Sequence, residues 1–107
     1  SGGLEGKMAK MQPAEAEKLL GNVPQDAAFR CHNGEMYWNL KDLGRGLASM
    51  DEYAFKYHVN EHKNDFATWI RDAVGDHALA RNLWDTRNPA TTSRRVAERV
   101  AFLESRR

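Results

Sequence analysis

The sequence predicts a mainly α-helical domain of the α+β class, with five or six short helices packed around one β-hairpin. Several segments place apolar residues three or four positions apart, which is the spacing of one helix face. Most of these segments begin with a capping residue or a proline. Only residues 28–38 have the pattern of a hairpin, and the length of 107 residues suits a single domain with one modest core.

We expect residues 1–11 to be a vector-derived remnant with a flexible N-terminal lead, and residues 12–107 to form the single helical domain. Pro13 suits the first turn of a short helix, because an N–H group there would have no partner within the helix. Gly21 marks the end of this helix.

The hairpin at residues 28–38 is predicted from Asn33-Gly34, a pair that adopts the positive φ angles of a two-residue type I′ turn. This turn fixes the register, so that alternate residues share a face. The predicted apolar face is Phe29, Cys31, Met36 and Trp38, and the predicted polar face is Arg30, His32, Glu35 and Tyr37. Because an isolated hairpin is marginally stable in water, its apolar face should pack on helices.

Two short helices are predicted after the hairpin. Asn39 is a good N-cap for the first, in which Leu40, Leu43 and Leu47 share a face. Ser49 and Glu52 have the spacing of a capping box, which predicts that a second helix begins there and continues to about His58.

The central helix has the clearest apolar pattern in the chain. Either Asn64 or Asp65 can cap it, since both side chains accept hydrogen bonds from the first turn. Its apolar residues fall at i, i+3, i+4 and i+7, and Gly75 is a stop signal. The predicted core of the domain is Phe29, Trp38, Leu43, Leu47, Phe55, Phe66, Trp69, Ile70, Leu79 and Leu83.

Two further helices complete the predicted fold. Asp76 caps the first, and Asn88-Pro89 provides a cap and a first-turn proline for the second. The last helix carries a narrow apolar seam of Val96, Val100 and Leu103. We expect this seam to dock on the core of the same chain, with a weak dimer as the alternative.

The run from Phe55 to Asp72, with the pattern FxxHVNxxKNDFAxWIRD, resembles the signature of a small archaeal-type family classed as a domain of unknown function. The similarity extends over about residues 17–84, through Phe29-Arg30-Cys31 and residues 39–43. The resemblance implies a recurrent compact module and carries no activity with it.

Composition excludes several classes of function. The 16 basic and 15 acidic residues leave a formal net charge of +1, which provides no global attraction for nucleic acid or an acidic membrane. The single cysteine suits a reducing compartment, and no apolar run reaches the ~20 residues needed to span a bilayer. These features predict a cytoplasmic protein.

The cysteine and the histidines give no good catalytic or metal site. Cys31 and His32 are adjacent in a predicted strand, so their side chains point to opposite faces and cannot form a nucleophile–base pair. His58 and His62 are four residues apart, but the predicted cap at Asn64 indicates that the helix breaks between them. We expect no enzyme activity, no cofactor and no bound metal.

The densest group of polar residues lies at the junction before the central helix, where loops often present binding groups. Helix capping alone would explain Asn64 and Asp65. The polar group is therefore either a binding site or simply the start of the helix. The candidate ligand or partner site consists of His58, Asn60, Lys63, Asn64 and Asp65.

The predicted function is a small, non-enzymatic, cytoplasmic interaction or regulatory domain with a protein partner, present as a monomer or weak homodimer. One alternative is a nucleic-acid-binding accessory domain, because seven basic and three acidic residues lie in residues 81–107. Arg94, Arg95 and Arg99 would then contact phosphates. The second alternative is a metal- or small-ligand-binding domain at the 58–65 junction.

Overall fold

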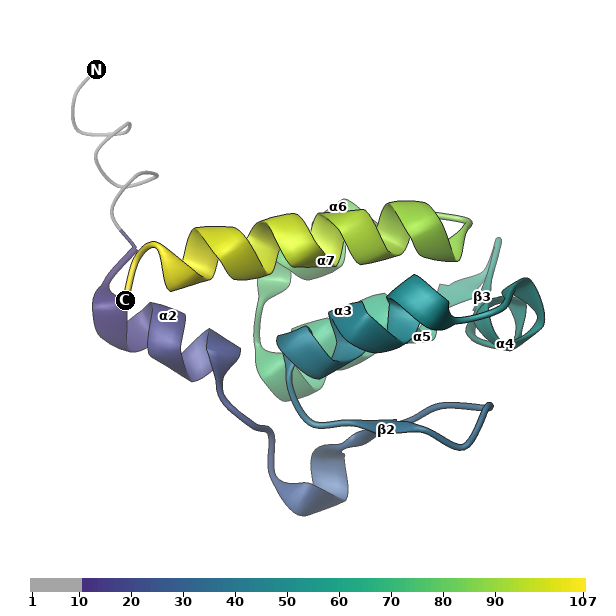
Figure 1. The fold of residues 1–107 in the computed structure, drawn as a ribbon, viewed down its shortest axis with the longest axis horizontal. Coiled ribbons are helices and arrows are strands. Elements are labelled where there is room, and N and C mark those ends of the chain that lie inside the picture. The colour runs from purple at the N-terminus through teal and green to yellow at the C-terminus, as the bar shows by residue number, and fades with distance from the viewer. Residues whose placement is uncertain (1–10) are drawn as a thin grey trace.

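The computed structural model describes residues 11–107, which form a mainly α-helical fold with a β-hairpin, as predicted (Figure 1). The helices are α2 (Pro13–Leu20), α3 (Leu40–Ser49), α4 (Glu52–His58), α5 (Asp65–Trp69), α6 (His77–Leu83) and α7 (Pro89–Glu104), with a 3-10 turn η1 (Gln25–Ala27) and a π-helical turn η2 (Ile70–Val74). The strands pair antiparallel as β1 (Phe29–Arg30) with β2 (Met36–Tyr37), and β3 (Val59–Asn60) with β4 (Lys63–Asn64). Most of the predicted N-terminal lead lies outside the described residues, but its last residue, Met11, packs partly buried against the core.

The predicted helix start at Pro13 and four of the predicted N-caps are confirmed. The side-chain oxygens of Asn39, Asn64, Asp76 and Asn88 each accept a hydrogen bond from the backbone N–H three residues further on, at 2.7, 3.0, 3.1 and 2.8 Å. These bonds satisfy N–H groups that have no partner within the helix. Asn64, rather than Asp65, is therefore the cap of the central helix.

Helices α3 and α7 lie side by side and form the main helix pair of the fold (Figure 1). Val96 and Leu103 of α7 are fully buried, and Val100 is nearly so. A Cβ atom at Gly44 would lie 3.3 Å from Cγ1 of Val96, so the absence of a side chain there lets the two helices approach closely. The last helix thus docks on the core of its own chain, as expected.

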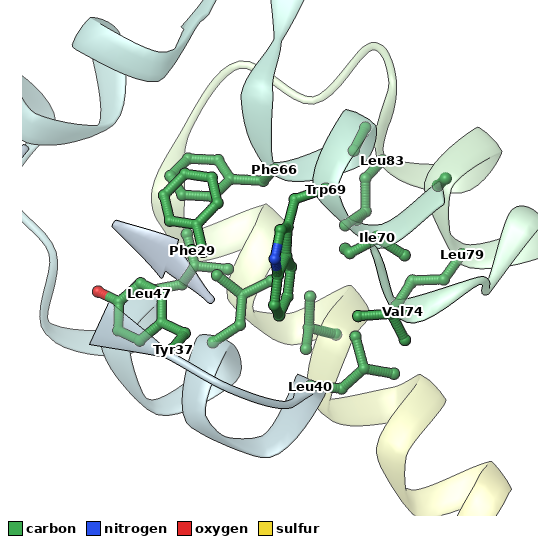
Figure 2. Close-up of a cluster of buried hydrophobic side chains, with 14 of the residues drawn as sticks. Phe29, Tyr37, Leu40, Leu47, Phe66, Trp69, Ile70, Val74, Leu79 and Leu83 are labelled. Atoms are coloured by element: carbon green, nitrogen blue, oxygen red, sulfur yellow. The ribbon is translucent and has the colours of Figure 1, made fainter. Parts of the chain in front are cut away.

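The central helix is α5 continued by η2, and its apolar face fills the middle of the core (Figure 2). Phe66 and Ile70 are fully buried, and Trp69 donates a hydrogen bond from Nε1 to the backbone oxygen of Ala27 at 2.7 Å. The final turn widens so that the Gly75 N–H donates to the carbonyl of Ile70, five residues back, at 2.8 Å. Gly75 has φ of 91°, a left-handed conformation that glycine adopts without strain.

The predicted hairpin register is wrong by one residue. Phe29 pairs with Tyr37, because the loop has three residues: the Gly34 N–H donates to the Cys31 oxygen, and Gly34 has φ of 93°. Tyr37 is consequently buried on the same face as Phe29, whereas Trp38, a predicted core residue, is only partly buried. The other nine predicted core residues are buried.

The predicted capping box at Ser49 is also wrong. Ser49 is the last residue of α3, and its hydroxyl donates to the Gly46 carbonyl at 3.4 Å. Asp51 caps α4 instead, since its Oδ1 accepts from the Ala54 N–H at 2.8 Å. The cap lies two residues later because the chain turns at Met50 with extended backbone angles, which ends α3 first.

Candidate functional site

The structure brings three of the five predicted site residues into contact where α4 ends and α5 begins. Nδ1–H of the buried His58 donates to Oδ2 of Asp65 at 3.0 Å. Lys63 Nζ donates to the same carboxylate oxygen at 3.1 Å. The short β3–β4 ladder reverses the chain between the two helices and so places Asp65 beside His58.

Asn60 and Asn64 stabilise the local fold. Oδ1 of Asn60 accepts the backbone N–H groups of His62 and Lys63 at 2.7 and 3.0 Å, which closes the turn between β3 and β4. Asn64 is fully buried, and its Nδ2 donates to the Leu83 carbonyl at 2.9 Å while its Oδ1 caps α5. Asn64 therefore ties the central helix to the end of α6.

Both ring nitrogens of His58 are occupied. The backbone N–H of His32, at the hairpin tip, donates to Nε2 at 3.0 Å, so the proton of the neutral ring resides on Nδ1. Phe29 and Phe66 border the ring, with centroids at 5.0 and 5.3 Å. With neither nitrogen free, His58 acts as a bridge between the hairpin and the central helix.

His58 and His62, which are four residues apart in the sequence, lie in different environments. His62 is exposed in the turn after β3, whereas His58 is buried. Among residues 11–107, no three His, Cys, Asp or Glu side chains gather in a way that could hold a metal ion.

Outside this bridge lies a group of exposed side chains that we call the aromatic surface: His32, Tyr53, Tyr57 and Lys63. The rings of His32 and Tyr57 are stacked, with centroids 3.9 Å apart and planes at 9°. The Tyr53 ring lies 5.9 Å from His32, and Lys63 Nζ lies 5.6 Å from the centre of the Tyr57 ring. Tyr53 and Tyr57 are 78% and 56% exposed, whereas tyrosine is typically of intermediate burial.

The sequence interpretation missed the two tyrosines, yet the sequence contains a signal for them. The buried residues of α4 are Ala54, Phe55 and His58, which form one side of a two-turn helix. Tyr53 and Tyr57 are four residues apart and therefore share another side. An amphipathic reading of this helix leaves both tyrosines in solvent.

Acidic and basic groups are balanced around the aromatic surface. Lys63 pairs with Asp65, and Lys56 Nζ lies 3.6 Å from Glu52 across one turn of α4. Within the hairpin, Tyr37 of β2 donates its hydroxyl to Glu35 Oε1 at 2.8 Å. Burial, assisted by this hydrogen bond to a carboxylate, raises the pKa of Tyr37, which stays a neutral donor.

Two of the three predicted nucleic-acid contacts are engaged within the chain. Arg99 donates from Nε and Nη2 to both carboxylate oxygens of the buried Asp76, at 2.8 and 3.0 Å. Arg95 donates from Nη1 to the Asn82 carbonyl at 2.7 Å. Arg94 is exposed on α7. The three guanidinium groups do not form one open basic patch.

No helix within residues 11–107 is long and apolar enough to cross a membrane. Comparison of the chain with protein families, curated proteins and solved structures finds no match, so the resemblance to the family of unknown function stays a prediction.

Proposed function

We propose that this chain is a non-enzymatic interaction module that binds a protein partner through the aromatic surface. The observation that carries the proposal is the pair of tyrosines on α4, which are 78% and 56% exposed and ordered against the His32 ring. Tyrosine is enriched among the residues that dominate binding energy in protein interfaces.

The stack is positioned before any partner arrives. The His32 N–H bond to His58 holds the hairpin tip against α4, and the Asp65 bond fixes the orientation of the His58 ring. A surface that is already ordered loses less conformational entropy on binding. The polar junction predicted as a site thus supports the binding surface from beneath, and Lys63 contributes to its edge.

The charge around the surface favours a protein partner over nucleic acid. Single-stranded nucleic acids also stack on aromatic rings, but their binding depends on a positively charged groove along the backbone. Here Lys56 and Lys63 each lie beside a carboxylate, which offsets the positive charge. A partner that presents apolar groups within a mixed polar rim fits this surface best.

The test compares proteins captured from the native host by the wild-type chain and by the double variant Tyr53→Ala/Tyr57→Ala. The matched control is Glu15→Ala/Lys18→Ala, two exposed side chains on α2. The proposal is supported by a captured protein that binds the wild type and the control but not the tyrosine variant. The same protein, once purified, should show the same preference in a direct binding measurement. A purified partner that binds all three chains equally contradicts it.

A further inference from the structure

A pocket of about 410 Å³ lies between the central helix and α6, separate from the aromatic surface. Its volume is within the range of roughly 300–1,000 Å³ that small-molecule sites occupy. The lining residues are Ala67, Arg71, His77, Ala80, Arg81, Trp84 and Asp85.

The pocket exists because two alanines face it. Ala67 of α5 and Ala80 of α6 are buried and form its floor, and their short side chains leave space between the helices. His77, Ala80 and Arg81 of α6 fall at i, i+3 and i+4, and the C-cap residue Trp84 falls at i+7, so one side of this helix and its C-cap form a wall. Five of the seven lining residues therefore lie on the central helix or α6, and Trp84 and Asp85 lie in the turn that follows α6.

Trp84 is the aromatic side chain of that wall. It is 48% exposed, whereas Trp69 at the centre of the core is 9% exposed. An indole ring that borders an open pocket offers a flat apolar face on which a planar ring can stack.

The pocket presents two guanidinium groups that can donate hydrogen bonds to an anion. Arg71 and Arg81 carry permanent positive charges, and His77 adds an imidazole at the rim. Asp72 binds Nε and Nη2 of Arg71, which leaves Nη1 outside the pair. The one carboxylate in the lining, Asp85, lies 3.9 Å from Nη1 of Arg95, so part of its charge is offset from outside the pocket.

From this combination we propose that the pocket binds a small molecule in which a planar aromatic ring carries a phosphate, the chemistry of a nucleoside monophosphate. The ring stacks on Trp84, and the phosphate accepts hydrogen bonds from Arg81 and from Nη1 of Arg71. Guanidinium groups suit phosphate because their planar donors match its oxygen geometry. A phosphate has more acceptor oxygens than a carboxylate, so it can accept hydrogen bonds from both arginines at once.

The test is a calorimetric titration of the full chain with each of the common ribonucleoside monophosphates. At least one should bind saturably with a Kd below about 1 mM, and the corresponding nucleoside and inorganic phosphate should each bind about tenfold more weakly or worse. Absence of saturable binding by every nucleotide overturns the proposal. Equal binding by the nucleoside or by phosphate alone also overturns it, because the phosphate or the ring would then contribute nothing to the affinity.

Two variants locate the site. Trp84→Ala and Arg81→Gln each remove one exposed side chain, so both should fold, and each should weaken nucleotide binding by about tenfold or more. Arg45→Gln makes the same change of charge on α3, away from this pocket, and should leave the affinity unchanged. Binding that survives both variants, or that falls equally with Arg45→Gln, overturns the assignment to this pocket. Neither result bears on the aromatic surface, which shares no residue with the pocket.

Discussion

The aromatic core and the aromatic surface use similar ring contacts for different purposes. In the core, Phe29 lies 4.9 Å from Phe66 and 5.9 Å from Trp69, measured between ring centroids, and all three are buried. On the surface, the rings of His32 and Tyr57 stack at 3.9 Å but stay in solvent. Burial decides whether such ring contacts stabilise the fold, because stability depends on the apolar area removed from water. The comparison separates residues that hold the fold from residues that are available to a partner.

The largest effect is expected from Trp69→Ala. The substitution removes a buried indole and its hydrogen bond to the Ala27 carbonyl, so unfolding free energy should fall by about 3–5 kcal/mol. Urea denaturation followed by circular dichroism measures the loss. A decrease below about 1 kcal/mol would show that Trp69 is not central to the core.

The next largest effect concerns a buried ion pair. Arg99→Ala leaves the carboxylate of Asp76 buried without its partner, and we expect a loss of about 2–3 kcal/mol. The matched control is Lys56→Ala, which breaks an exposed pair with Glu52 and should leave the urea midpoint unchanged. Equal effects of the two substitutions would mean that burial does not distinguish these pairs.

The third prediction separates two possible caps of α4. Asp51→Ala should destabilise the domain by about 1 kcal/mol, because the Ala54 N–H loses its acceptor. Ser49→Ala should have a smaller effect, since its hydroxyl only donates to a carbonyl within α3. The thermal midpoints of both variants measure the two losses. A larger loss for Ser49→Ala than for Asp51→Ala would indicate that Ser49 caps α4.

The smallest effect on stability is expected from the aromatic surface. Tyr53→Ala/Tyr57→Ala should change the unfolding free energy by no more than about 0.5 kcal/mol, because both rings are largely exposed. The same urea experiment provides the value. A loss comparable to that of Trp69→Ala would mean that the tyrosines stabilise the fold as the aromatic core does.

Features set by neighbouring residues in the chain could be predicted from the sequence. The caps at Asn39, Asp76 and Asn88, and the apolar faces of α3 and α7, depend on residues within a few positions of each other. The hairpin register could not be predicted in this way. The Tyr37 ring fills the space where a Cβ atom at Gly46 would lie, so a distant glycine accommodates the observed register.

The candidate site also has some features that could be predicted from the sequence and others that could not. Its position at the 58–65 junction follows from a local cluster of polar residues, three of which are in contact in the structure. The bond between His58 and the His32 backbone joins residues 26 positions apart, and no local pattern indicates it. The exposed tyrosines were detectable from helical spacing, but the stack of Tyr57 on His32 depends on that distant bond.

The most direct test of the aromatic surface is a ¹H–¹⁵N NMR titration of the wild-type chain with the purified partner. The largest shifts should fall at the hairpin tip and along α4, at His32, Tyr53 and Tyr57 and at neighbouring Lys63. Amides on α7 should change little, because its apolar seam is buried against the rest of the chain. Shifts concentrated on α7 or around Trp84, with the tyrosine amides unchanged, would show that the partner binds elsewhere than the aromatic surface.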